Sequence, residues 1–293
     1  MTAQGGNPEA AGDLAGAARH RAALAAAREA RQMLLVERHE RLAAETGLPF
    51  HTAMADMHRK VAVRHRTAAQ LQKSFAVRAA QWSAGSGDRP LFMAEVADAC
   101  GTRSVALTLV GVDLSQIAVA ASDPPARGAQ DLEYVLGSGP ARDAVGGRLP
   151  VAASGAAVEQ RWPGYGAGLA GLGLTAVVAF PLTAPSGCIG ALTVFDPRPG
   201  VAEGGVLEEM AATLAGGVLL GPDADPGLYG GADLRAVVHQ AAGVLSEQVR
   251  CPVEDALALI KARAFAVGES AESVAAQIVS GSLRLRLGLF GVD

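Results

Sequence analysis

The side chains that could perform covalent or metal chemistry are scattered along this sequence. Its three cysteines, Cys100, Cys188 and Cys251, lie far apart, and none has the spacing of a metal or redox pair. No histidine occurs between His65 and His239, and no glycine run has the GxxxxGK[ST] pattern that cradles phosphates. We therefore expect a protein that is not an enzyme and that holds no metal and no cofactor.

Charge is distributed unevenly along the chain. The formal net charge is -4, but residues 19–80 carry 12 Lys and Arg against 5 Asp and Glu, together with five of the six histidines. Residues 84–222 carry 7 against 13. The basic side chains of Arg59, Lys60, Arg64 and Arg66 are therefore either a solvated helix face, which we favour, or a surface that helps to hold RNA.

Two long helices are predicted for the N-terminal part, residues 13–82, after a disordered segment at 1–12. The first is expected over 14–46, because Gly47 and Pro49 follow it, and the second over 51–82. The second helix carries a coiled-coil-like stripe. Its members are Met54, Met57, Val61, Arg64, Ala68, Leu71 and Phe75. Such a hairpin is expected to pack on the rest of the protein or on a second copy.

Strand patterns dominate residues 91–221. We predict strands over 104–112, 114–121, 176–182 and 189–195, and short extended pieces at 132–136 and 149–152. A loop-and-helix region is expected at 159–171, and helices at 91–100 and 207–219. Strands gathered into an antiparallel sheet with flanking helices make an α+β domain.

Four pieces of this region form a recognisable series: Leu132-Glu133-Tyr134-Val135-Leu136-Gly137-Ser138-Gly139-Pro140, Arg161-Trp162-Pro163, Ala179-Phe180-Pro181-Leu182 and Ile189-Gly190-Ala191-Leu192. In this order they resemble the GAF domains that actinobacterial regulators pair with ANTAR modules. The resemblance implies a sensor fold that binds a small molecule or dimerises, with Tyr134, Arg161 and Trp162 as candidate ligand contacts. Packing is the competing role for these three side chains. A covalently bound bilin is disfavoured, because residues 122–175 contain no cysteine.

Three amphipathic helices are predicted for residues 232–281, after a Pro- and Gly-rich linker. Asp233 is expected to cap the first helix, which runs to about Gln248. Pro252 suits the first turn of the second helix, and Ser270 can cap the third. Three short helices joined by tight turns predict a compact bundle.

Three elements of this bundle resemble the ANTAR family. Val238-His239-Gln240-Ala241-Ala242-Gly243-Val244-Leu245 is similar to its QAKGxL element, Glu254–Ile260 to EAFxxL, and Ser273–Val279 to DVAxxIV. The resemblance implies binding to paired RNA hairpins in nascent transcripts and transcription antitermination. The RNA contacts that it implies are Arg235, His239, Gln240, Gly243, Lys261 and Arg263.

The bundle departs from the family at two contacts. Ala242 stands where the family usually has lysine, and Arg263 replaces the usual aromatic residue, although a guanidinium can also stack on a base. Residues 233–286 carry 6 basic and 6 acidic side chains, so one copy should bind RNA weakly.

Two hypotheses follow for the whole chain. The first is a cytoplasmic, signal-responsive RNA-binding regulator, acting as a homodimer without membrane contact. The alternative is a non-enzymatic scaffold protein whose RNA binding has degenerated.

Overall fold

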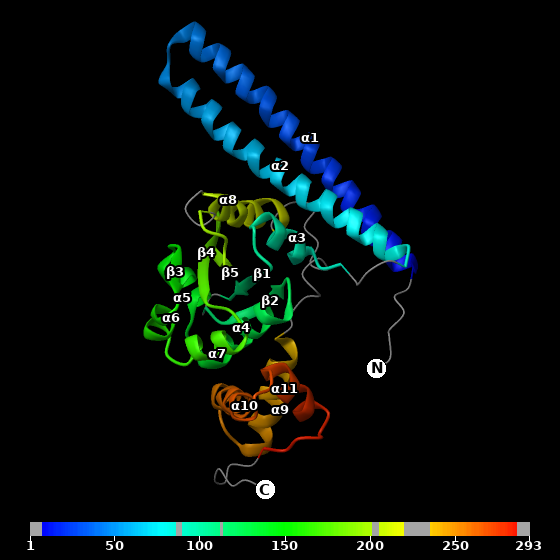
Figure 1. Cartoon of the computed structure of the whole chain (residues 1–293), viewed down its shortest axis with the longest axis vertical. Coiled ribbons are helices and arrows are strands. Elements are labelled where there is room, and N and C mark those ends of the chain that lie inside the picture. Colours follow the sequence, from blue (N-terminus) through cyan, green and yellow to red (C-terminus); the bar gives the residue numbers. More distant parts are fainter. Residues whose placement is uncertain (1–7, 86–89, 112–113, 201–204, 220–234, 286–293) are drawn as a thin grey trace.

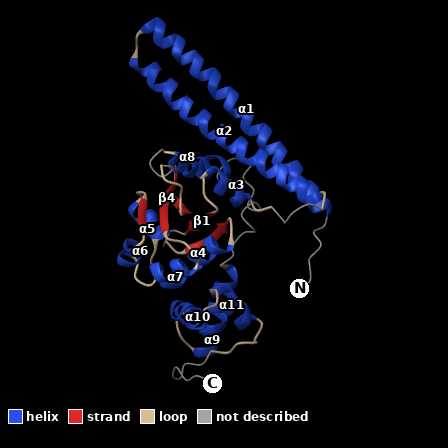
Figure 2. Cartoon of the chain, in the orientation of Figure 1, coloured by secondary structure: helices blue, strands red, loops and turns tan. Residues whose placement is uncertain are grey.

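The protein is a mixed α+β chain with three visibly separate parts. A computed structural model describes residues 8–85, 90–111, 114–200, 205–219 and 235–285. A long helical hairpin lies at one end, a sheet flanked by helices in the middle, and a small helical bundle at the other end (Figure 1). The strands of the described chain all belong to the middle part (Figure 2).

The hairpin consists of α1 (Pro8–Thr46) and α2 (Pro49–Ser83). Gly47 ends α1 with a positive φ of 66°, which glycine adopts without strain, and Pro49 opens α2. The end of α1 is therefore at the predicted residue, and α2 begins within two residues of the predicted position, whereas α1 begins earlier than predicted. Residues 8–12, which we expected to be disordered, form the first part of α1, and residues 1–7 lie outside the described residues.

Alanines form the seam between α1 and α2. Ala55, Ala62, Ala69 and Ala76 recur every seven residues along α2 and are buried, as are Ala18, Ala22 and Ala25 of α1. Side chains this small let two helix axes approach closely, and the seven-residue spacing keeps them on one face.

The predicted stripe on α2 is buried only where the hairpin meets the sheet part. Leu71 and Phe75 are buried, whereas Met57, two heptads before Leu71, is 45% exposed. Met57 is therefore not covered within one copy of the chain, and the prediction that the stripe packs on a second copy stays a prediction. Figure 1 shows that the end of the hairpin next to the turn between α1 and α2 extends beyond the sheet part.

The sheet has five antiparallel strands in the order β2-β1-β5-β4-β3. They are β1 (Ser104–Val110), β2 (Gln116–Ala121), β3 (Val151–Ser154), β4 (Ala176–Ala184) and β5 (Gly187–Phe195). The four strands predicted from β-rich runs are all present, and β4 and β5 form the predicted hairpin.

The side chains of successive residues in the central strands point to opposite faces of the sheet and belong to two different cores. Leu107, Phe180 and Leu192 face a core shared with α2, α3 (Phe92–Ala99), α8 (Val206–Thr213) and a π-helix (Leu214–Leu219). Their neighbours Ala179 and Ala191 face a second core, under the helices on the other side. These helices are α4 (Pro124–Leu136), α5 (Pro140–Gly147), α6 (Ala156–Arg161) and α7 (Tyr165–Gly171). Helices thus cover both faces of the sheet.

Gly190 has a packing reason for its place in β5. It pairs with Leu109 of β1, and a Cβ at this position would lie 2.0 Å from the Thr108 carbonyl oxygen. Two strand backbones can approach this closely only because the glycine carries no side chain.

Helix α4 contains residues 132–136, for which the prediction of an extended piece is wrong. The Asp123 carboxylate accepts a hydrogen bond from the Ala126 amide at 2.9 Å, Pro124 opens the helix, and Gly137 closes it in the left-handed conformation. These start and stop signals specify a helix over the whole segment, so Tyr134 and Val135 are helical although their residue types favour strands.

The bundle consists of α9 (Ala236–Val249), α10 (Val253–Val267) and α11 (Ala271–Val279). Its core is small and aliphatic, built from side chains such as Val238, Leu245 and Ile260. Ser270 caps α11 as predicted, by accepting a hydrogen bond from the Ser273 amide. Pro252 is the residue directly before α10, and Asp233 lies outside the described residues. Among the described helices, none is both long and apolar enough to cross a membrane.

Candidate functional site

Helix α4 is the element on which the bundle docks. The ring of Tyr134 is contacted by two cations from the bundle: the Arg235 guanidinium carbon lies 3.9 Å from its centroid and the Lys261 ammonium 4.0 Å from it. Cation–π contacts of this kind strengthen when the cation is removed from water. Arg235 is fully buried and Lys261 is partly buried, so both contacts lie in a largely dry junction.

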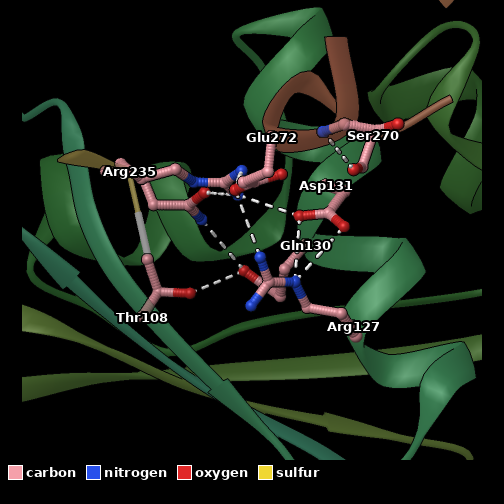
Figure 3. A network of polar contacts seen from close by, with 9 residues as sticks. Thr108, Arg127, Gln130, Asp131, Arg235, Ser270 and Glu272 are labelled. Carbon is pink, nitrogen blue, oxygen red and sulfur yellow. Dashed lines mark hydrogen bonds and ion pairs between the residues drawn. The ribbon is translucent and has the colours of Figure 1, made fainter. Parts of the chain in front are cut away.

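A network of ion pairs surrounds Arg235 (Figure 3). Its guanidinium donates to Asp131 of α4 at 3.0 Å, to Glu272 of α11 and to Gln116 of β2. Arg127 of α4 also contacts both acidic residues, with Nε 3.1 Å from Asp131 and Nη2 3.1 Å from Glu272. Two arginines and two carboxylates from both parts therefore balance one another, as burial of such charges requires.

The network continues into the sheet. The Thr108 hydroxyl of β1 donates to the side-chain oxygen of Gln130 at 2.6 Å, and Gln130, a residue of α4, is fully buried. Gln116 lies beside Gln130 and also accepts from Arg235. Hydrogen bonds thus link side chains of β1 and β2 to α4 and to Arg235 of the bundle.

A cavity of about 200 Å³ opens beside this junction. The sheet part contributes its lining from β1, β2, α4 and α5, with Glu133, Tyr134 and Arg142 as the main functional groups. The bundle contributes His239 of α9 and Leu257 and Lys261 of α10. Two parts that are far apart in sequence therefore make one concave site.

Three ionisable groups that line the cavity have shifted pKa values, and burial raises that of Tyr134. Burial raises the pKa of Glu133 to about 7, against the opposing hydrogen bonds that its carboxylate accepts from the Arg142 and Ala141 amides. Burial also lowers the pKa of Lys261, and the positive charges of Arg235 and Arg142 lower it further. Perturbed groups that line one cavity are typical of binding sites.

The structure separates the six residues predicted to contact RNA. Arg235, His239 and Lys261 lie at the junction with α4, whereas Gln240 and Arg263 are exposed on the bundle. Gly243 is partly buried, and a Cβ there would meet nothing within 4 Å, so helix packing does not require this glycine.

The candidate ligand contacts are separated as well. Tyr134 lines the cavity, but Arg161 and Trp162 do not. Trp162 is buried and donates to Asp143 at 3.1 Å, while Arg161 lies over its ring at 5.0 Å and pairs with the same carboxylate. These two side chains therefore make the contacts expected of packing, which was the alternative to ligand binding considered for them.

The basic residues of α2 are mostly paired within the hairpin or with α8. Arg59 contacts Glu40 at 2.6 Å, and Arg66 contacts Glu29 at 2.7 Å. Arg64 lies 3.9 Å from Glu209 of α8. Pairs of this kind at exposed positions fit a solvated helix face.

Several residues of the junction carry a weak signal in the sequence. Arg127 and Asp131 have the i,i+4 spacing of a helical ion pair, but this becomes visible only once 132–136 is assigned to a helix. Nothing in the local sequence of Gln116, Arg142 or Glu272 points to the junction, because their partners are distant along the chain.

In comparisons with known proteins, no family model, no curated protein and no solved structure matches the chain.

Proposed function

We propose that the protein is a signal-responsive regulator whose C-terminal bundle binds RNA hairpins in nascent transcripts and promotes antitermination. In this proposal the bundle is an ANTAR module and the sheet part a GAF-type sensor that controls it. Homodimerisation would place two bundles on paired hairpins and supply the avidity that a bundle with balanced charge needs.

One observation carries the proposal. Arg235 and Lys261, two of the cations that the resemblance assigns to RNA, are held on Tyr134 of the sheet part instead. The carboxylate partners of these cations can be exchanged for RNA, because a phosphate of the RNA backbone can replace a carboxylate as the partner of an arginine. The described arrangement is then the resting form, and undocking frees these side chains for RNA.

The test is the mobility of a two-hairpin RNA in a native gel with the full chain. Binding should appear at low salt and weaken as salt rises. Arg263→Ala removes a cation that is exposed on the bundle and not engaged at the junction, and it should weaken binding about tenfold.

Arg198→Ala is the matched control, because it removes the same charge from an exposed position of the sheet part. Equal effects of the two variants would contradict a specific contact. No shift at tens of micromolar protein, in the wild type or in an undocked variant, would refute RNA binding.

A scaffold function is the second candidate, and the burial of Arg235 favours it. Arg235 has no exposed side-chain surface and contacts Asp131, Glu272, Gln116 and Tyr134, as a permanent structural arginine would. In that case the bundle should stay docked under all conditions, and RNA should bind neither wild type nor variants.

A further inference from the structure

The cavity between the sheet part and the bundle has an excess of positive charge. Arg142 of α5 and Lys261 of α10 both line it, and within the described part of the chain neither has a carboxylate at ion-pair distance. Arg142 makes one long contact, 3.5 Å, to the Leu114 carbonyl oxygen. Asp131 and Glu272 are already engaged by Arg127 and Arg235, so they do not neutralise the cavity.

Glu133 is the acidic residue among the lining groups, and it compensates this charge only in part. Its carboxyl is buried, with a pKa raised to about 7, so at neutral pH it is charged in only about half of the molecules. Its oxygens are also occupied by the Ala141 and Arg142 amides. The cavity therefore offers two cationic side chains without a fixed counter-charge.

The remaining lining is suited to an apolar body with a polar end. Val110, Leu114, Val145 and Leu257 supply aliphatic surface on several sides. The Tyr134 hydroxyl is buried and makes no hydrogen bond within the described residues, which leaves one polar group of the lining unsatisfied. A cavity of about 150 Å³ holds benzene in another protein, so about 200 Å³ is the size of a benzene ring with one carboxylate.

We infer that this cavity binds a small organic acid, a monocarboxylate with an apolar body of about the size of benzoate, between Arg142 and Lys261. Such a ligand contacts both parts at once and therefore binds only when the bundle is docked. By linkage, it stabilises the docked form over the undocked one. The effect on RNA rests on the proposed function: occupancy should lower RNA affinity.

Titration calorimetry on the full chain tests the site with three probes. Benzoate should bind, benzyl alcohol should bind at least tenfold more weakly because it lacks the charge, and inorganic phosphate should bind at least tenfold more weakly because it lacks the apolar body. Absence of benzoate binding at millimolar concentration would overturn the proposal, and so would equal binding of benzyl alcohol.

Variants locate the site and separate it from RNA binding. Arg142→Gln should weaken benzoate at least tenfold, whereas Arg263→Gln, on the same helix as Lys261 but exposed, should leave benzoate binding unchanged and weaken RNA. Retained benzoate affinity in Arg142→Gln, with the fold verified by circular dichroism, would place the ligand elsewhere and overturn the site.

A readout without RNA distinguishes failure of this inference from failure of the proposed function. Benzoate should slow amide hydrogen exchange in α4, α9 and α10 of the wild type, and not in Arg142→Gln. If exchange slows but RNA never binds, the ligand site stands and the proposed function falls. If benzoate binds without slowing exchange in α9 and α10, the bridging role is wrong.

Discussion

Tyr134 is the residue that most directly connects the two parts of the molecule. It lies within the segment that resembles a sensor-domain motif, yet its ring is covered by Arg235 and Lys261 of the bundle. An aromatic ring can bind two cations although it has no formal charge. When the cations leave, the ring does not remain as an unpaired buried charge, whereas a carboxylate would. Its neighbour Glu133 is the opposite case, a carboxyl group whose burial opposes its charged form.

Glu133 should make the stability of the protein depend on pH in an unusual direction. Its pKa is raised from 4.5 to about 7 by burial, so the native state binds the extra proton. This stability is fully present below pH 4.5 and is lost as pH rises through about 7. Glu133→Gln removes this dependence, and between pH 4.5 and 8 the variant should gain about 3 kcal/mol relative to the wild type.

Urea denaturation at the two pH values measures this difference. Glu208→Gln, at an exposed position of α8, is the matched control and should follow the wild type at both. A Glu133→Gln variant that loses stability equally at pH 4.5 and pH 8 would show that the pKa of Glu133 is the same in the native and unfolded states, and would contradict the raised pKa.

At the scale of elements, the sequence predicts those strands and helices whose own residues specify them. The runs 176–182 and 189–195 are rich in β-favouring residues around a Pro-Ser-Gly turn, and they form β4 and β5. The prediction for residues 132–136 is wrong because these residues favour an extended chain locally, whereas the residues that specify the ends of α4, Asp123 and Gly137, lie outside this segment. Met57 is exposed in one copy of the chain, because burial of a residue on a repeating face depends on what packs against that face, which the repeat itself does not specify.

The outer end of the hairpin should loosen at acidic pH. His39 and His51 join α1 to α2, with their Nδ1 atoms 3.1 Å apart, and the His58 ring stacks on His39. Desolvation lowers the pKa of His39, and the positive charges of His51, His58 and Arg38 lower it further. A lowered histidine pKa contributes stability that is present above about pH 6.5 and is lost as pH falls below it.

Amide exchange across 36–58, corrected for the intrinsic pH dependence of exchange, measures this effect. It should be faster at pH 5.5 than at pH 7.5 in the wild type, and this difference should shrink in His39→Gln. His20→Gln, at an exposed position of α1, should leave it unchanged. Equal protection at both pH values in the wild type would contradict the lowered pKa.

At the scale of the whole molecule, the candidate site could not be predicted from the sequence. The resemblance selects Arg235 and Lys261, but it places them on RNA, and it contains nothing about Asp131, which lies 104 positions from Arg235. The bundle and the sheet part each have a core of their own, so local patterns specify each of them without specifying how they dock. Only long-range contacts decide this, and they involve side chains whose local spacing is unremarkable.

The docking can be released by changing one carboxylate. Asp131→Asn leaves Arg235 and Arg127 to share Glu272, which should weaken docking by about 1.5–3 kcal/mol, the usual contribution of a hydrogen bond to a charged group. The radius of gyration from small-angle scattering should then increase, and RNA affinity should rise about tenfold as Arg235 and Lys261 become accessible. Asp98→Asn, which removes an exposed carboxylate paired with Arg78 far from the bundle, should change neither. A larger radius with unchanged RNA affinity would mean that undocking does not control RNA binding, and an unchanged radius would mean that the cation–π contacts to Tyr134 suffice to hold the bundle.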